Sequence, residues 1–164
     1  MTSDLQLALP GQKRLLNEWL VHAGQASPPA REAMQPAQFL SELGYISILQ
    51  LQDDTIRFRL VGSSVRRYIQ QDPRGHTLCD FPDIHDRVCG HESIMGALEG
   101  GKPTSGMDIF PQERVHFWLR LPVIDPQGHL TQVICHDRLL PADLLDDDHP
   151  EIARWCREQS RKAA

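Results

Sequence analysis

The chain has 164 residues, of which 40% are hydrophobic and 24% charged, and its formal net charge is -5 at pH 7. These proportions exclude a wholly disordered or fibrous chain. The acidic balance disfavours nucleic acid as the main partner, because phosphate neutralisation needs clustered Lys and Arg. No apolar run approaches the roughly 20 residues of a membrane-spanning helix, and the first ten residues lack the pattern of a signal peptide. We therefore expect one globular domain in the cytoplasm, without a membrane span.

The first predicted element is an amphipathic helix over residues 12–22. Leu15, Leu16, Trp19 and Leu20 fall on one face of this helix, and a segment rich in Gly, Ser and Pro predicts a linker after it. The apolar face must be buried somewhere. Either the helix packs on its own sheet, or it packs on a second copy of the chain and forms a homodimer.

A second short helix and a strand hairpin are predicted next. Pro36 suits the first turn of the helix. Two segments of strand-like composition, Tyr45–Leu51 and Thr55–Val61, flank Asp53 and Asp54, which are typical residues of a tight turn. This combination predicts an antiparallel pair of strands.

A helical excursion separates this hairpin from three further strands. Asp83 can cap a longer helix that ends near Gly100, and the later strands are expected at Thr104–Phe110, Arg114–Pro122 and Leu130–Asp137. This order predicts an antiparallel sheet with the helical excursion laid across one face. The fold class is therefore α+β: a five-stranded antiparallel sheet with helices on one face, plus an N-terminal amphipathic helix and a C-terminal extension.

The chain is expected to divide into three parts. Residues 1–35 form the N-terminal helix and linker, and residues 36–140 form the sheet domain. Residues 141–164 are an appendage with an acidic stretch and a segment of helical character at Ile152–Arg157. No internal repeat or low-complexity tract is apparent.

The strand at residues 114–122 alternates apolar and polar side chains. Phe117 and Leu119 alternate with Trp118 and Arg120. We expect the apolar pair to point inward, so Trp118 and Arg120 would lie on the outer surface of the sheet, under the N-terminal helix or against a partner. In the alternative arrangement, Tyr68, Trp118 and Arg120 orient a carboxylate or a ring of a ligand.

From about Trp19 to Leu140 the chain resembles the PAS domains found as short single-domain proteins in alphaproteobacteria. The matching features are Trp19 in the first helix, Arg57-Phe58-Arg59-Leu60-Val61-Gly62-Ser63, Gly75 to Leu78, and Phe117-Trp118-Leu119-Arg120-Leu121-Pro122. The resemblance implies a five-stranded antiparallel sheet flanked by helices and used for sensing, signalling or dimerisation. It implies no particular ligand.

The expected ligand site is the volume between the helical excursion and the sheet. It would bind a small apolar or amphipathic ligand and pass the signal to an unidentified signalling protein. The side chains predicted to line it are Phe58, Leu60, Phe81, Val88, Phe117, Leu119 and Ile134. If this volume is instead filled by side chains, the domain is a ligand-free interaction or dimerisation adaptor.

Haem is the sharpest cofactor hypothesis, because PAS domains that hold haem use a histidine of the helical excursion. His85 or His91 would be the ligand; otherwise both are surface or capping histidines. A zinc site that uses Cys135 and His136 is disfavoured, since adjacent residues of a strand point to opposite faces.

No catalytic apparatus is predicted. Cys135, His136 and Asp137 have the residue types of a nucleophile, a base and an orienting acid, but His136 would face away from both neighbours on a strand. The four cysteines are widely and irregularly spaced, so we expect free thiols. The Gly-rich loop and Lys of a nucleotide triphosphate site are missing. The sequence therefore predicts a sensory module without an enzymatic activity of its own.

Overall fold

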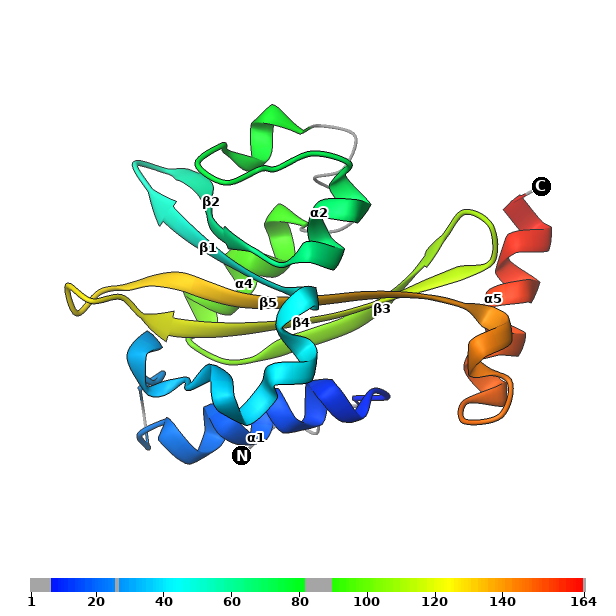
Figure 1. Ribbon diagram of the computed structural model, residues 1–164, viewed down its shortest axis with the longest axis horizontal. Helices are drawn as coiled ribbons and strands as arrows, with labels where there is room; N and C mark the ends of the chain where they lie inside the picture. The colour runs from blue at the N-terminus through cyan, green and yellow to red at the C-terminus, as the bar shows by residue number, and fades with distance from the viewer. Residues whose placement is uncertain (1–6, 26, 82–89, 164) are drawn as a thin grey trace.

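The computed structural model describes residues 7–25, 27–81 and 90–163, and its centre is one antiparallel sheet with helical segments on both faces (Figure 1). The strands are β1 (Ile46–Gln52), β2 (Thr55–Val61), β3 (Thr104–Phe110), β4 (Arg114–Ile124) and β5 (Leu130–Pro141). They lie in the order β2-β1-β5-β4-β3, so the first hairpin pairs with the last strand of the chain. The predicted α+β class and the predicted joining of two early and three late strands are confirmed.

A two-residue turn closes the β1–β2 hairpin. Gln52 pairs with Thr55, and the two residues between them, Asp53 and Asp54, have φ values of 49° and 58°. Two-residue hairpin turns of this kind need positive φ at both central positions, which Asp tolerates better than most residues. The hairpin and the position of its turn are therefore those that the sequence predicted.

One face of the sheet is covered by the first two larger helical segments. These are α1 (Pro10–His22) and the 3-10 helix η2 (Pro36–Tyr45), with the short η1 (Arg31–Ala33) between them. Leu15 and Trp19 of α1 are buried, and the indole Nε1 of Trp19 donates a hydrogen bond of 2.7 Å to the carbonyl of Pro122. Of the two alternatives for the first helix, packing on its own sheet is therefore the one observed.

The opposite face is covered by the helical excursion, as predicted. Its described elements are α2 (Ser63–Ile69), η3 (Leu78–Asp80) and α4 (His91–Gly100). The core beneath them joins Val65, Ile69, Leu78, Ile94 and Leu98 to Leu49, Ile56, Phe58, Val133 and Cys135 of the sheet. The first part of the helix that was predicted to begin at Asp83 lies outside the described residues. Within the described residues, no helix is both long and apolar enough to cross a lipid bilayer.

The C-terminal segment is an ordered part of the fold rather than a loose appendage. The 3-10 helix η4 (Ala142–Leu145) leads into α5 (Pro150–Ala163), which is longer than the predicted helical segment. Ala153 and Cys156 of α5 are buried with Val115 and Phe117 of β4. The segment therefore extends the core at the end of the sheet.

The sequence-based assignment of the two faces of β4 was wrong. Phe117 and Leu119 lie under α5 and α1, respectively, whereas Arg120 lies on the face that α4 covers, where its side chain contacts Ser93. Helices cover both faces of this central strand, so alternation between apolar and polar residues does not tell which face carries the excursion. The polar residues of β4 consequently lie inside the protein.

A bulge in β2 reverses the side-chain alternation near its end. Leu49 of β1 pairs with Phe58 but Ile48 pairs with Leu60, so Arg59 stands opposite no residue of β1. After this extra residue, Val61 takes the buried side and Leu60 is 47% exposed. Ile56 and Phe58 therefore share the buried face and Leu60 does not, because a bulge shifts the period of two.

We predict that Gly62→Ala destabilises the protein by about 1–3 kcal/mol, the usual range for overpacking. The Gly62 amide donates a hydrogen bond to the Ile46 carbonyl at 2.7 Å, and a Cβ there would lie 2.4 Å from the Gly44 carbonyl oxygen. Urea unfolding measures the change. Gly96→Ala is the control, since nothing lies within 4 Å of a Cβ at this exposed helical position, and it should stabilise α4 by about 0.5–1 kcal/mol. Equal effects of the two substitutions would contradict the proposed backbone contact.

Candidate functional site

The candidate site is a polar network on the face of the sheet that α4 covers, and a buried ion pair lies at its centre. Nη2 of Arg120 on β4 donates to Oδ1 of Asp137 on β5 at 2.8 Å. The Arg120 side chain is 1% exposed and that of Asp137 is fully buried. Nη1 of Arg120 also donates to the carbonyls of Leu119 and His136, at 3.1 and 3.4 Å. Burial would raise the pKa of Asp137, but Arg120 and His116 hold it below its ordinary value.

His116 joins this ion pair to a second carboxylate. Its Nε2 lies 2.8 Å from Oδ1 of Asp137, and its Nδ1 lies 3.8 Å from Oδ2 of Asp108 on β3. Burial alone would lower the pKa of His116, but the carboxylates of Asp108 and Asp137 outweigh this effect and raise the pKa above its ordinary value. The imidazole is therefore a buried, titratable bridge between two acidic groups.

Asp108 and Trp118 form the outer part of the network. The indole Nε1 of Trp118 donates to Oδ2 of Asp108 at 2.9 Å, and the Asp108 side chain is 59% exposed. The Trp118 ring packs directly on β3, since a Cβ at Gly106 would lie 2.4–2.9 Å from its atoms. The Arg120 guanidinium carbon lies 5.4 Å from the centre of the Trp118 ring, a cation–π distance.

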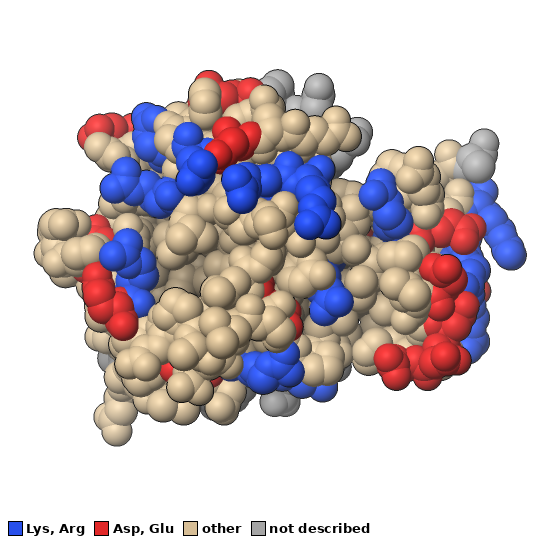
Figure 2. Space-filling view, viewed as in Figure 1, with Lys and Arg blue, Asp and Glu red and all other residues tan. Residues whose placement is uncertain are grey.

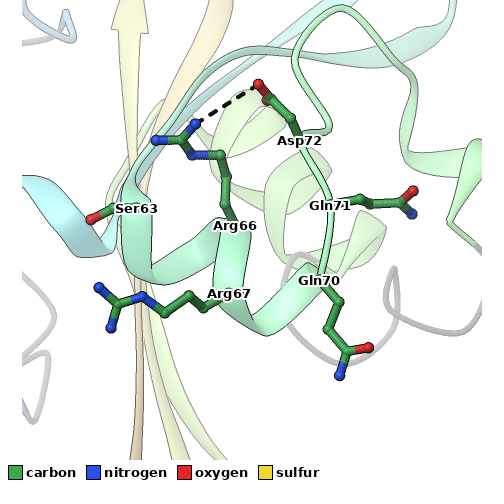
Figure 3. A pocket seen from close by; sticks show the side chains of 6 residues that line it. All are labelled: Ser63, Arg66, Arg67, Gln70, Gln71 and Asp72. Atoms are coloured by element: carbon green, nitrogen blue, oxygen red, sulfur yellow. Dashed lines mark ion pairs between the residues drawn. The ribbon is translucent and has the colours of Figure 1, made fainter.

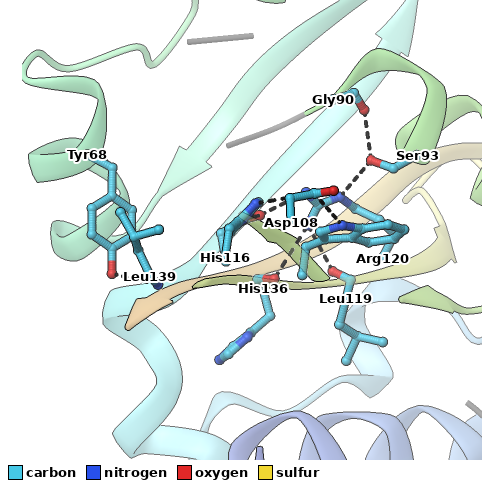
Figure 4. A network of polar contacts seen from close by, with 11 residues as sticks. Tyr68, Gly90, Ser93, Asp108, His116, Leu119, Arg120, His136 and Leu139 are labelled. Carbon is cyan, nitrogen blue, oxygen red and sulfur yellow. Dashed lines mark hydrogen bonds and ion pairs between the residues drawn. The ribbon is translucent and has the colours of Figure 1, made fainter. Parts of the chain in front are cut away.

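Two helices of the excursion are attached to the sheet by polar contacts in this region (Figure 4). Ser93 of α4 accepts a hydrogen bond of 3.2 Å from Nε of Arg120, and its hydroxyl donates to the Gly90 carbonyl at 2.8 Å. On α2, the hydroxyl oxygen of Tyr68 accepts a hydrogen bond of 3.3 Å from the Leu139 amide. Both helices are thus positioned by hydrogen bonds as well as by apolar packing.

Comparison with known proteins fits this architecture. A PAS domain family model matches residues 8–100, which is more than half of the chain. The chain belongs to the PAS domain family. Among solved structures, VqmA bound to DPO is similar, with 23% sequence identity and a TM-score of 0.47. That match covers 68% of this chain and 64% of the VqmA chain, so the chain spans slightly less than two thirds of VqmA. No curated protein matches it.

Most residues of the network lie outside the part of this PAS domain that the family model matches. Asp108, His116, Arg120 and Asp137 follow residue 100, whereas Ser93 precedes it. The charged part of the site is therefore formed by β3, β4 and β5, beyond the segment that the family model matches.

The structure does not bring the predicted ligand-binding residues together. Phe58 and Phe81 lie in the core beneath the excursion, and Leu60 is exposed. The other described residues, Phe117, Leu119 and Ile134, lie on the opposite face of the sheet. Val88 lies outside the described residues. A role in ligand binding stays a prediction for all seven residues, of which Phe58 and Phe81 share the face of the polar network.

Of the two predicted haem ligands, the structure describes His91. His85 lies outside the described residues, and His91 is the first residue of α4 and is exposed. Within residues 7–25, 27–81 and 90–163, no group of three or more His, Cys, Asp or Glu side chains could hold a metal ion.

Adjacent residues of β5 point to opposite faces, as the sequence predicted. Asp137 binds Arg120, whereas Nε2 of His136 lies 2.8 Å from Oε2 of Glu42 in η2. Burial raises the pKa of the Cys135 thiol to about 12, so it stays protonated and unreactive near neutral pH. Cys135, His136 and Asp137 therefore do not form a nucleophile, base and acid. Cys79, Cys135 and Cys156 are free thiols.

Glu42 anchors α1 on the far side of the sheet. Its carboxylate accepts a hydrogen bond of 3.1 Å from Nη2 of Arg14 in α1. Gly11 packs so closely on this carboxylate that a Cβ there would lie 2.2–2.5 Å from its atoms. The hydrogen bond with His136 lowers the pKa of Glu42. Buried polar contacts therefore hold helical elements on both faces of the sheet.

A surface hollow on α2 is a weaker candidate site. It has a volume of about 530 Å³ and is lined by Ser63, Arg66, Arg67, Gln70, Gln71 and Asp72. In Figure 3, Ser63 and Arg67 point to one side of the helix and Gln71 to the other. Figure 2 shows basic side chains gathered over α2 and β2, and acidic ones over the segment that leads into α5. The hollow is open and its side chains point away from one another, whereas the side chains of the polar network point toward one another.

Sequence reasoning identified Tyr68, Trp118 and Arg120 as a possible ligand-orienting group but missed the other members of the network. His116 and Arg120 are four residues apart in a strand in the middle of the sheet and therefore share one face. Two polar residues on one face of a central strand indicate a buried polar face. Asp137 lies two residues after the apolar run Val133–Cys135 in β5 and is a second such signal. Asp108 and Ser93 carry no comparable signal, because polar residues are ordinary on an edge strand and in a helix.

We predict that His116 makes the stability of the domain depend on pH. Because its pKa is raised in the folded state, its stabilising contribution is fully present below the ordinary pKa of 6.5 and is lost as pH rises through the higher folded-state pKa. The free energy of unfolding should therefore decline above pH 6.5 in the native chain. Urea unfolding at a series of pH values should show no such component in His116→Gln. His22→Gln, which removes a surface histidine paired with Glu18, should keep the native profile.

We also predict that Asp137→Asn destabilises the fold by about 3–5 kcal/mol, because it removes the carboxylate that neutralises a buried Arg120. Thermal and urea unfolding measure the loss. Asp146→Asn is the matched control, since its ion pair with Arg157 is at the surface and should contribute little. A loss for Asp137→Asn no larger than that for Asp146→Asn would show that the Arg120 ion pair does not hold the strands together.

Proposed function

We propose that this PAS domain is a sensory module that binds a small ligand between the α2 and α4 layer and the sheet, and reports the binding to a protein partner. The observation that carries the proposal is a polar network whose centre, formed by Arg120, Asp137 and His116, is buried. It lies on the inner surface of the sheet, where a purely structural core would be apolar.

Energetics support a functional reason for this network. Removing two charges from water is expensive, and well-packed apolar residues of similar volume are often as stable as a buried ion pair or more so. Natural proteins depart from the simplest stabilising choice mostly at functional sites. A site that recognises a ligand needs fixed polar groups, and Arg120 and Asp137 are fixed by packing on every side.

The network also offers a route from ligand to output. Arg120 holds Ser93 of α4, and Leu139 holds Tyr68 of α2. A ligand that competes for these contacts or reinforces them would change the relative stability of conformers in which α2 and α4 sit differently on the sheet. Signalling would then proceed by a shift in conformer populations, which the partner reads from the outer surfaces of these helices.

The arrangement offers little for catalysis. The buried thiol of Cys135 is held protonated, and Arg120 and Asp137 are committed to each other. We therefore propose that the domain has no catalytic activity of its own, in keeping with its family.

Native mass spectrometry of freshly purified protein, with an absorbance spectrum, tests the proposal. We expect an additional non-covalent mass per chain that is lost on denaturation, and no Soret band. The same spectrum counts the subunits and so tests whether the chain forms a homodimer. If the measured mass is that of the polypeptide alone, and no compound in a metabolite extract stabilises the protein against thermal unfolding, the result would favour a ligand-free adaptor. A Soret band would favour a haem sensor.

A further inference from the structure

The electrostatics of the network restrict the class of ligand. We propose that the site between α4 and the sheet binds a neutral or cationic ligand that donates hydrogen bonds to Asp108 and packs an apolar ring against Trp118, and that it rejects carboxylates and phosphates. This inference rests on the proposed ligand-binding function and adds the chemistry of the ligand.

The guanidinium of Arg120 is not available to bind an anionic ligand. Its guanidinium is already paired with Asp137 at 2.8 Å, donates to Ser93 and donates to two backbone carbonyls. A ligand carboxylate would have to compete with an intramolecular carboxylate that is fixed at the best distance. Moving Arg120 toward the ligand would leave Asp137 buried beside a weakened counter-charge, which is strongly unfavourable.

The charges of the described network do not favour an added negative charge. Asp108 and Asp137 are two carboxylates, and Arg120 with a protonated His116 balances them. With neutral His116 the four groups carry a net charge of -1. An anionic ligand would add a negative charge beside Asp108, and its repulsion from the buried carboxylate of Asp137 would be screened less than repulsion between two exposed charges.

Asp108 is the polar group that is presented outward. Its side chain is 59% exposed, and the His116 imidazole, together with the hydrogen bond from Trp118, holds its pKa below the ordinary value. An ionised carboxylate accepts about four hydrogen bonds, and the indole hydrogen bond at Oδ2 uses one of these positions. The remaining capacity suits a ligand with N–H or O–H donors.

Trp118 supplies an aromatic surface beside this acceptor. Its ring is partly exposed and is held against β3 by the absence of a side chain at Gly106. A carboxylate next to a fixed indole ring is a usual way to bind a flat group that carries a hydrogen-bond donor or a positive charge. A ligand that fits both groups needs an apolar face for the indole ring and an N–H or O–H group that donates a hydrogen bond to the carboxylate.

Three probes of nearly equal shape test the inference: benzamidine, benzamide and benzoate, which are a cation, a neutral donor and an anion. The chain has three tryptophans, so the indole N–H signals of labelled protein are few, and Trp118→Phe identifies the signal of Trp118. Each probe is titrated while this signal is followed. We expect benzamidine and benzamide to bind at least about tenfold more tightly than benzoate, which corresponds to about 1.4 kcal/mol.

Asp108→Asn is the decisive variant. Asn keeps the size of the side chain and an oxygen that can accept the Trp118 hydrogen bond, but it removes the charge. We expect the preference for benzamidine over benzoate to fall by about tenfold, a loss of about 1.4 kcal/mol. Asp54→Asn removes one carboxylate from the exposed β1–β2 turn and should leave the preference unchanged.

The outcomes separate the two proposals. If benzoate shifts the Trp118 signal and binds as tightly as benzamidine, the ligand class is wrong and the proposed binding function stands. If Asp108→Asn and Asp54→Asn change the preference equally, the role of Asp108 is wrong. If none of the probes shifts the Trp118 signal and native mass spectrometry finds no bound ligand, both proposals fail.

Discussion

The ion pair between Arg120 and Asp137 is the constraint on which the rest of the structure depends. It joins the two central strands of the sheet, β4 and β5, on the face that the helical excursion covers. A charge buried this deeply must have partners in fixed positions. Ser93 of α4 contacts this ion pair through Arg120, and His116 contacts it through Asp137. The position of α4 on the sheet therefore depends on where the ion pair lies.

Strand β5 places buried polar contacts on both sides of the sheet with consecutive residues. Asp137 contacts the network beneath α4, and His136 contacts Glu42, which in turn holds Arg14 of α1. The alternation of a β-strand makes this arrangement possible, because neighbouring side chains point in opposite directions. The helices on the two faces are thus attached to the sheet through one dipeptide.

The sequence predicted the order of elements and the topology well. Turn residues such as Asp53 and Asp54 define a hairpin locally, and the predicted bounds of β2 and β3 match the structure. What it could not determine was which face of a central strand carries which layer. Phe117 and Trp118 both lie on covered faces, so hydrophobicity alone did not distinguish them. The network was largely missed because Asp108 and Asp137 are far apart in sequence and come to lie on either side of His116 only when β3, β4 and β5 pair.

The bulge at Arg59 makes the length of β2 a structural requirement. The residue itself is exposed and opposes nothing in β1, so its identity is free to vary. A residue is nevertheless required at this position. Deletion of one residue there would move Gly62 away from the carbonyls of Leu43 and Gly44, which only a glycine can approach so closely. Related chains should therefore tolerate many side chains at this position but not the insertion or deletion of a residue. The length of the strand would then be conserved although the residue type is not.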